Sequence, residues 1–138
     1  MAYKVFLDAN VILDSSLQRH SFEHSKKVFD QIREGTISGF TMPSILQISS
    51  YLMAKELGHV KTKQLLLALL ANVISIDCPH EIVLLALNSR IHDIEDAIQY
   101  YKAMHHKMDY FISLDKKLVK EAIPSLPVLT PMDFIAIL

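Results

Sequence analysis

Short apolar runs rich in β-branched and aromatic residues alternate along this chain with longer segments of helical periodicity. The runs that predict strands are residues 3–7, 37–42, 73–76, 109–113 and 127–129. The segments that predict helices are 21–34, 44–57, 60–71, 79–90 and 92–106, with short helices after residue 115 and from residue 131. Strands that are apolar throughout and alternate with helices predict a mainly parallel sheet covered on both faces. We therefore expect an α/β three-layer sandwich with a central sheet of about five strands.

Residues that ordinarily start or stop helices stand at several of these boundaries. Ser21 is a candidate N-cap, Gly35 follows the helix that Ser21 begins, Pro43 suits a first helical position and Gly58 ends the next apolar face. We find no internal repeat, linker or low-complexity segment. A chain of 138 residues has the size at which one core buries roughly two-thirds of the unfolded surface. We expect a single domain, residues 1–138.

The charge balance limits how this protein could hold a nucleic acid. Half of the residues are apolar (51%), 21% are charged, and the formal net charge is −1. A broad basic surface, which gives non-specific duplex binding its affinity, is therefore excluded. Any nucleic acid has to be held locally, through metal ions and a few lysines.

Two features indicate where the protein acts. The longest apolar run, residues 65–76, is interrupted by Asn72 and Ser75 and is shorter than the roughly 20 residues that a bilayer requires. The first residues lack the apolar segment of a secretory signal, and the single cysteine, Cys78, allows no intrachain disulfide. We expect a cytoplasmic protein without a membrane span.

Acidic residues follow two of the predicted strands. Asp8 closes the first strand and Asp115 lies just beyond the fourth. In parallel α/β sheets, ligands bind outside the carboxyl ends of the strands, where the strand order reverses. If these strands are neighbours, both carboxylates face one crevice. The helix before the fourth strand adds Asp93 and Asp96, which are three residues apart and share a helical face, whereas Glu95 is expected to point elsewhere.

Such a group of carboxylates predicts a metal site. Three or four carboxylates in one cleft repel each other unless cations neutralise them, and sites with oxygen ligands alone suit Mg²⁺ or Mn²⁺. These ions lower the pKa of a bound water and orient it for attack on a phosphodiester. The chemistry inferred is metal-assisted phosphodiester hydrolysis.

Three segments of the sequence resemble motifs of the PIN-domain family. Residues 6–14, Phe-Leu-Asp-Ala-Asn-Val-Ile-Leu-Asp, resemble its opening motif, a hydrophobic strand followed by L-D-T-N-V-L-L-D. Residues 93–97, Asp-Ile-Glu-Asp-Ala, resemble its D-F-E-D-A helix signature, and residues 112–117, Ile-Ser-Leu-Asp-Lys-Lys, resemble its I-T-R-D-K-K stretch. The motifs occur in the family's order and span essentially the whole chain.

The resemblance implies a nuclease fold shared with the toxins of VapBC-type toxin-antitoxin pairs. It implies a metal-dependent endoribonuclease that uses Mg²⁺ or Mn²⁺, an RNA substrate, an antitoxin partner and a homodimer. The apolar parts of the helices around residues 44–70 are candidates for the dimer surface. By position, the catalytic metal ligands would be Asp8, Asp96 and Asp115, with Asp93 as an additional ligand; Asn10 and Ser113 would orient the carboxylates or the metal waters.

One position departs from the family pattern. The family commonly places a glutamate on the helix after the second strand, where this chain has Gln47. A neutral amide accepts a hydrogen bond from a metal-bound water but supplies no charge to a dication. The alternative hypothesis is therefore a catalytically weak or inactive PIN-like module that binds RNA or protein.

Plainer interpretations remain for the individual acids. Asp8 could cap the helix that begins near Val11, and Asp115 could cap the short helix that follows it. Asp14 is expected to be a structural hydrogen-bonding residue, and Asp77 and Asp109 to be solvated. The seven histidines lack the spacing of a zinc site and are expected at the surface.

Other aspartate-based α/β classes fit less well. A phosphatase of the haloacid-dehalogenase kind needs a second aspartate two positions after the first, where this chain has Asn10. A phosphotransfer receiver needs an acidic pair near its first strand, which we do not find.

Overall fold

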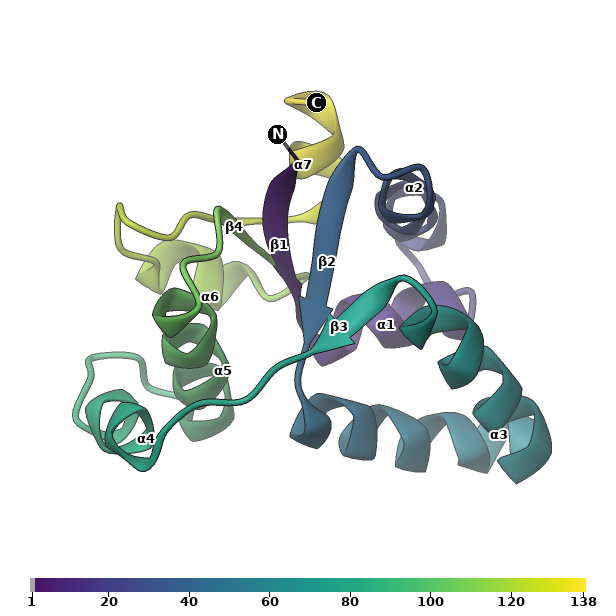
Figure 1. The fold of residues 1–138 in the computed structure, drawn as a ribbon, viewed down its shortest axis with the longest axis horizontal. Helices are drawn as coiled ribbons and strands as arrows, with labels where there is room; N and C mark the ends of the chain where they lie inside the picture. The colour runs from purple at the N-terminus through teal and green to yellow at the C-terminus, as the bar shows by residue number, and fades with distance from the viewer. Residues whose placement is uncertain (1) are drawn as a thin grey trace.

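The chain alternates strands and helices in the order that the sequence predicts (Figure 1). A computed structural model describes residues 2–138. The strands are β1 (Tyr3–Leu7), β2 (Ile37–Thr41), β3 (Val73–Ser75), β4 (Tyr110–Ile112) and β5 (Val128–Leu129). The helices are α1 (Ala9–Ser16), α2 (Phe22–Arg33), α3 (Pro43–Leu70), α4 (His80–Leu87), α5 (Ile94–His105), α6 (Lys116–Glu121) and α7 (Pro131–Ala136).

The strands form one parallel sheet whose order is β3-β2-β1-β4-β5. The chain moves outward from β1 through β2 to β3 and then returns to the other side of β1 to form β4 and β5. The strand order therefore reverses between β1 and β4, where Leu7 pairs with Ile112. The predicted five-stranded parallel sheet is confirmed, and the first and fourth strands, whose adjacency the sequence left open, are neighbours. A crevice at the carboxyl ends of these two strands is the usual ligand site of such sheets.

Two hydrophobic cores cover the two faces of the sheet. Successive side chains of a strand point to opposite faces, so Leu7 of β1 packs with Phe134 of α7 on one face. Phe6 of β1 stacks on Phe111 of β4, at 5.1 Å between ring centroids, on the other face, where Tyr100 of α5 joins the same core. This packing gives the predicted three layers, with α2 and α7 on one side and α5 and α6 on the other.

The long helix α3 is kinked at Gly58. This residue has φ 78° and ψ 166°, a conformation that residues with a Cβ avoid. The sequence predicts one helix that ends at Gly58 and another from residue 60. The kink matches that break, although residues 43–70 run as one element.

Two other predicted helices have different ends because side chains cap them. The helix expected over 79–90 ends at Leu87, and the Asn88 side chain donates a 2.8 Å hydrogen bond to the Leu84 carbonyl. The helix expected over 92–106 begins at Ile94, because Asp93 is its N-cap. Helix boundaries of this kind depend on cap geometry rather than on apolar periodicity.

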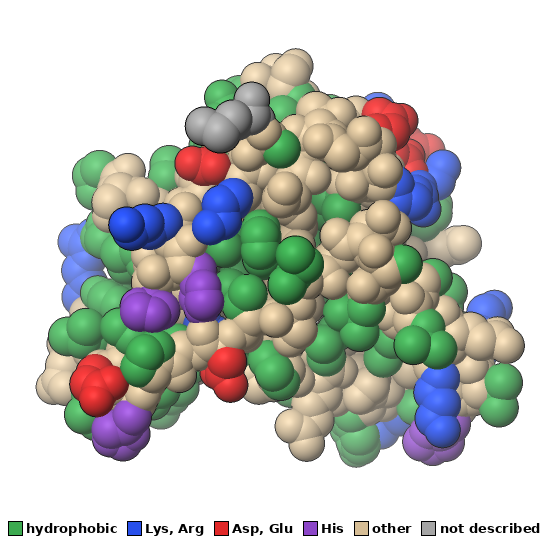
Figure 2. Space-filling view, in the orientation of Figure 1, with side chains coloured by type: hydrophobic (Ala, Val, Ile, Leu, Met, Phe, Trp, Pro, Cys, Tyr) green, Lys and Arg blue, Asp and Glu red, His purple; other side chains and the backbone are tan. Residues whose placement is uncertain are grey.

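Apolar side chains are exposed on two helices. They lie on the kinked helix α3, where they include Tyr51, Val60 and Leu67, and on α4, where they are Leu84, Leu85 and Leu87. Figure 2 shows hydrophobic side chains gathered over α4, at the lower left. Within residues 2–138, none of the helices has both the length and the apolar character that crossing a bilayer requires.

Gly39 of β2 offers a test of how tightly α2 packs on the sheet. A Cβ added at Gly39 would lie 2.6 Å from Ile32 Cδ1 and 3.3 Å from Val73 Cγ2. We expect Gly39→Ala to lower the free energy of unfolding by about 1–3 kcal/mol, because the added methyl overpacks a buried contact. In a double-mutant cycle measured by urea unfolding, Ile32→Val removes the clashing methyl, so the double variant should lose less stability than the sum of the single changes. Additive losses would contradict the contact.

Candidate active site

Asp8, at the carboxyl end of β1, is held by hydrogen bonds from its neighbours. We call Asp8, Asp93, Asp96 and Asp115 the acid cluster. Its Oδ1 accepts a 2.7 Å hydrogen bond from the Ala9 N–H and so caps α1. Its Oδ2 accepts from Ser113 Oγ at 2.8 Å and from Asn10 Nδ2 at 3.3 Å. The residue is only 4% exposed, and this burial raises the pKa of Asp8 to about 6, although the hydrogen bonds from Ser113 and Ala9 oppose the shift. Asp8 is therefore both a helix cap and a buried carboxyl group with a fixed orientation.

Asn10 and Ser113 connect the chain after β1 to the chain after β4. The Leu114 N–H donates to Asn10 Oδ1 at 3.1 Å, and the Asp115 N–H donates to Ser113 Oγ at 3.0 Å. The same Ser113 hydroxyl donates to Asp8. These contacts place both polar residues beside the acids that the sequence expected them to orient.

Asp96 and Asp115 approach each other from two different helices. Asp115 is the N-cap of α6, since its Oδ1 accepts a 2.9 Å hydrogen bond from the Lys117 N–H. Asp96, in the first turn of α5, is half-buried. Its pKa is raised to about 8, first by burial, then by the charge of Asp8 and by a hydrogen bond between its carboxyl group and that of Asp115, with Asp93 adding to the shift. Burial and the neighbouring acids therefore favour the neutral form of Asp96.

The position of Asp93 relative to α5 differs from the sequence expectation. Asp93 does not share a helical face with Asp96; it precedes the helix and caps it, with its Oδ1 accepting from the Asp96 N–H at 3.0 Å. The aspartate at the N-cap, followed three residues later by a second aspartate, was the signal for the cap. Glu95 is exposed, and its Oε1 accepts from Gln99 at 3.1 Å. After burial, the charge of Glu95 is a lesser cause of the raised pKa of Asp8, and the expectation that Glu95 points elsewhere stays a prediction.

Gln47 lies on the helix after β2, as expected. It is exposed near the start of α3, and its backbone carbonyl accepts from Ser50 Oγ at 2.8 Å. Across residues 2–138, no direct hydrogen bond connects its side-chain amide to Asp8, Asp96 or Asp115.

The carboxylates of the acid cluster are the candidate ligands of a divalent ion. In the part of the chain that the structure describes, no three His, Cys, Asp or Glu side chains are gathered closely enough to hold a metal ion. The expected convergence of three or more carboxylates at ligand distance is therefore absent. The carboxylates present nevertheless suit Mg²⁺, because this ion is usually held by one or two carboxylates and keeps several waters. The raised pKa values of Asp8 and Asp96 indicate carboxyl groups without a neutralising partner, which a hard dication would supply.

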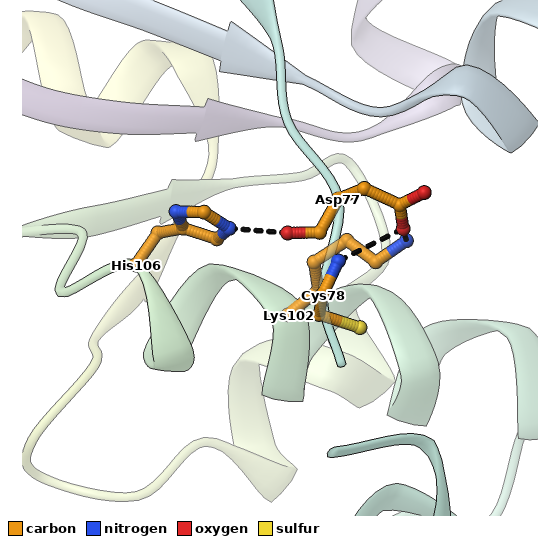
Figure 3. A network of polar contacts seen from close by, with 4 residues as sticks. All are labelled: Asp77, Cys78, Lys102 and His106. Carbon is orange, nitrogen blue, oxygen red and sulfur yellow. Dashed lines mark hydrogen bonds and ion pairs between the residues drawn. The ribbon is translucent and has the colours of Figure 1, made fainter. Parts of the chain in front are cut away.

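A second polar network ties the chain after β3 to α5 (Figure 3). The buried Lys102 ammonium donates to Asp77 Oδ1 at 2.8 Å, the Cys78 N–H donates to the same oxygen at 2.8 Å, and His106 Nε2 bonds the Asp77 carbonyl. The hydrogen bond from Lys102 is the main cause of the lowered pKa of Asp77. Asp77 lies just after the edge strand β3 and is exposed, as expected, and it also pairs with Lys102. Its pair with Lys102 helps to hold the helix that carries Asp96.

Asp14 and Asp109 have structural roles. Asp14 is 2% exposed and accepts from Ser25 Oγ at 2.6 Å and from the Ser21 N–H at 3.0 Å, so its expected role as a hydrogen-bonding residue is confirmed. Asp109, expected to be solvated, is exposed but accepts from the Lys4 N–H at 2.8 Å. Neither carboxylate belongs to the acid cluster.

Solved structures with the same arrangement come from several organisms. The chain is similar to VapBC2 from Rickettsia felis, bound to a DNA fragment from its promoter, at a TM-score of 0.69 and 12% identity over 92% of this chain and 98% of that chain. VapC20 of Mycobacterium tuberculosis, described as a Sarcin-Ricin loop cleaving toxin, matches at a TM-score of 0.63 and 12% identity over 80% of this chain and 89% of that one. PAE2754 from Pyrobaculum aerophilum matches at a TM-score of 0.69 and 15% identity over 99% and 96%. At these identities the likeness shows a common fold.

Sequence comparison identifies the family. No curated protein matches the chain significantly. A family model for the PIN domain matches residues 4–117, a span that includes the acid cluster and every strand except β5. The five-stranded parallel sheet with its helices on both faces agrees with this match. This chain belongs to the PIN domain family.

Proposed function

We propose that this protein is a Mg²⁺- or Mn²⁺-dependent endoribonuclease that hydrolyses RNA phosphodiester bonds, and that it is the toxin of a toxin-antitoxin pair. The observation that carries the proposal is the position of Asp8 and Asp115 after the neighbouring strands β1 and β4, beside Asp96, whose pKa is raised by its burial and by the charges of both. Membership of the PIN domain family supports nuclease chemistry. The description of VapC20 as a Sarcin-Ricin loop cleaving toxin favours RNA over DNA.

In this proposal the acids have distinct roles. Asp96 and Asp115, whose carboxyl groups are in contact, would hold the metal ion together with Asp8, and Asp93 would be an additional ligand through the oxygen that does not cap α5. When bound, the ion would supply a Lewis acid that lowers the pKa of a water molecule. Asn10 and Ser113 fix the orientation of Asp8 by hydrogen bonds. Such outer contacts typically matter for metal affinity by about 10- to 100-fold.

A catalytically weak PIN module is the second candidate. It is favoured by Gln47, which is neutral where the family commonly has an acid. Such a module would bind RNA or a protein partner and would show little turnover.

The proposal also includes partners and a location. The VapBC2 structure contains a toxin-antitoxin pair, and by analogy this chain would bind an antitoxin. The exposed apolar side chains of α3, among them Tyr51, Val60 and Leu67, favour a homodimer, because contiguous apolar surface of this kind marks protein interfaces. The protein would act in the cytoplasm as a single domain.

Substitution of the acids tests the catalytic proposal. Asp8→Asn, Asp96→Asn and Asp115→Asn should each reduce Mn²⁺-dependent RNA cleavage roughly 100-fold or more, because each removes charge from the metal site. Asp30→Asn is the matched control, since Asp30 lies on α2 and pairs only with Arg33 at the surface; it should retain wild-type activity. Equal cleavage by Asp8→Asn and wild type would refute the assignment.

Substitution of Gln47 separates the two candidate functions. Gln47→Glu restores a negative charge at the position where the family commonly has glutamate. If an active metal site forms there, calorimetry should record roughly tenfold tighter Mn²⁺ binding, about 1.4 kcal/mol, and RNA cleavage should rise with it. Unchanged Mn²⁺ affinity would mean that position 47 does not take part in the site.

The pKa values predict how the stability of the metal-free protein depends on pH. The folded state raises the pKa of Asp8 to about 6 and of Asp96 to about 8 from 3.8, so folding favours the neutral acids. Their stabilising effect is complete below about pH 4 and is lost as the pH rises through 6 and 8. Relative to wild type, Asp96→Asn should therefore melt a few degrees higher at pH 8.5 in EDTA, with the difference vanishing at pH 4. A pH-independent difference in Tm would contradict the pKa of Asp96.

A further inference from the structure

A cleft of about 630 Å³ opens beside the acid cluster. Its walls come from α1 and the turn that follows it, from the first turn of α2, from the loop after β4 and from the start of α7. Its volume lies within the roughly 300–1,000 Å³ that is typical of ligand sites. The cleft is large enough to hold part of an extended chain.

One end of the cleft is shared with the candidate active site. Asn10 and Leu114 line it, and these two residues are joined by the hydrogen bond from the Leu114 N–H to Asn10 Oδ1. Asn10 also donates to Asp8, and Lys116, another lining residue, follows Asp115 directly. A ligand in the cleft would therefore extend from the position where the acids act.

The cleft concentrates positive charge on a protein whose net charge is −1. Arg19 and Lys116 line it together with His20 and His24, which add ring nitrogens. Among the residues of the wall, Asp14 is the acid, and its two carboxylate oxygens are already engaged by Ser25 Oγ and the Ser21 N–H. The cleft thus presents the side chains of Arg19 and Lys116 to an anion.

Arg19 is available to such an anion. Its guanidinium lies 3.8 Å from Glu56 Oε1, and both side chains are about half exposed. Exposed pairs of this kind contribute little to stability, about 0–1 kcal/mol. A phosphate in the cleft would compete with Glu56 for Arg19.

We infer that this cleft holds the RNA strand next to the bond that is cut, with Arg19 and Lys116 binding a backbone phosphate. The inference rests on the proposed ribonuclease function and adds to it the surface that grips the substrate. RNA is favoured over an acidic protein segment because Asn10 and Lys116, which line the cleft, adjoin Asp8 and Asp115, so that a strand lying in it would present its next phosphate to these acids.

The test compares two double variants of the full chain that lose the same charge. Arg19→Gln/Lys116→Gln changes the cleft, whereas Lys26→Gln/Lys63→Gln removes two exposed lysines that do not line it. The probe is a short fluorescein-labelled single-stranded RNA of mixed sequence, with affinity followed by anisotropy over a salt series and cleavage followed with Mn²⁺. Thermal melting verifies that all variants are folded.

The cleft variant should bind RNA roughly tenfold more weakly and raise KM by a similar factor, with kcat nearly unchanged. Its slope of log K against log[salt] should fall in magnitude by about 0.7 for each phosphate that the variant no longer binds. The lysine control should match wild type. Glu56→Gln, which removes the competing carboxylate, should bind RNA as tightly as wild type or more tightly; weaker binding would mean that Arg19 acts through its pair with Glu56 and would overturn the inference.

Failure of this inference can be told apart from failure of the proposed function. If wild type cleaves RNA and the cleft variant has the same affinity and KM, the cleft assignment is wrong and the ribonuclease function stands. If the cleft variant keeps its RNA affinity but binds a poly-glutamate peptide more weakly than wild type, the cleft is a protein-docking site. If wild type neither binds nor cleaves RNA, both proposals fall.

Discussion

The crowding of carboxyl groups where the strand order reverses is the constraint on which the site depends. Parallel strands bring the residues after β1 and β4 to the same edge, and α5 adds Asp96 there. Three of these acids also cap helices: Asp8 caps α1, Asp93 caps α5 and Asp115 caps α6. A helix N-terminus favours negative charge, which offsets part of the repulsion. Burial is the main cause of the raised pKa values of Asp8 and Asp96, and the charges of neighbouring acids add to it.

Several contacts far from the acids keep α5 in place. The Tyr100 hydroxyl donates to the Leu126 carbonyl at 2.6 Å, which connects α5 to the chain before β5. Lys102, on the same helix, pairs with Asp77 after β3. Because α5 is held at both edges of the sheet in this way, the position of Asp96 depends on contacts with chain segments on both sides of the central strand β1.

The sequence predicted the parallel sheet, because strand periodicity determines it, and left open whether β1 and β4 are neighbours, which the structure shows. The expected convergence of Asp8, Asp96 and Asp115 at ligand distance is absent among the described residues. The sequence misjudged Asp93, since the start of α5 is defined by a cap rather than by apolar spacing. The pairing of Asp77 with Lys102 joins residues 25 positions apart and leaves no local pattern. The cleft was equally invisible, because its walls come from elements that only the folded chain brings together.

A single claim underlies the functional account: one divalent ion binds between the carboxyl groups at the ends of β1 and β4 and the first turn of α5. Anomalous diffraction from a crystal soaked in Mn²⁺ would test it most directly. We expect a manganese peak within coordination distance of oxygens from Asp96 and Asp115, with Asp8 bound directly or through a water. A manganese peak elsewhere, or none at these carboxylates at saturating Mn²⁺, would contradict it.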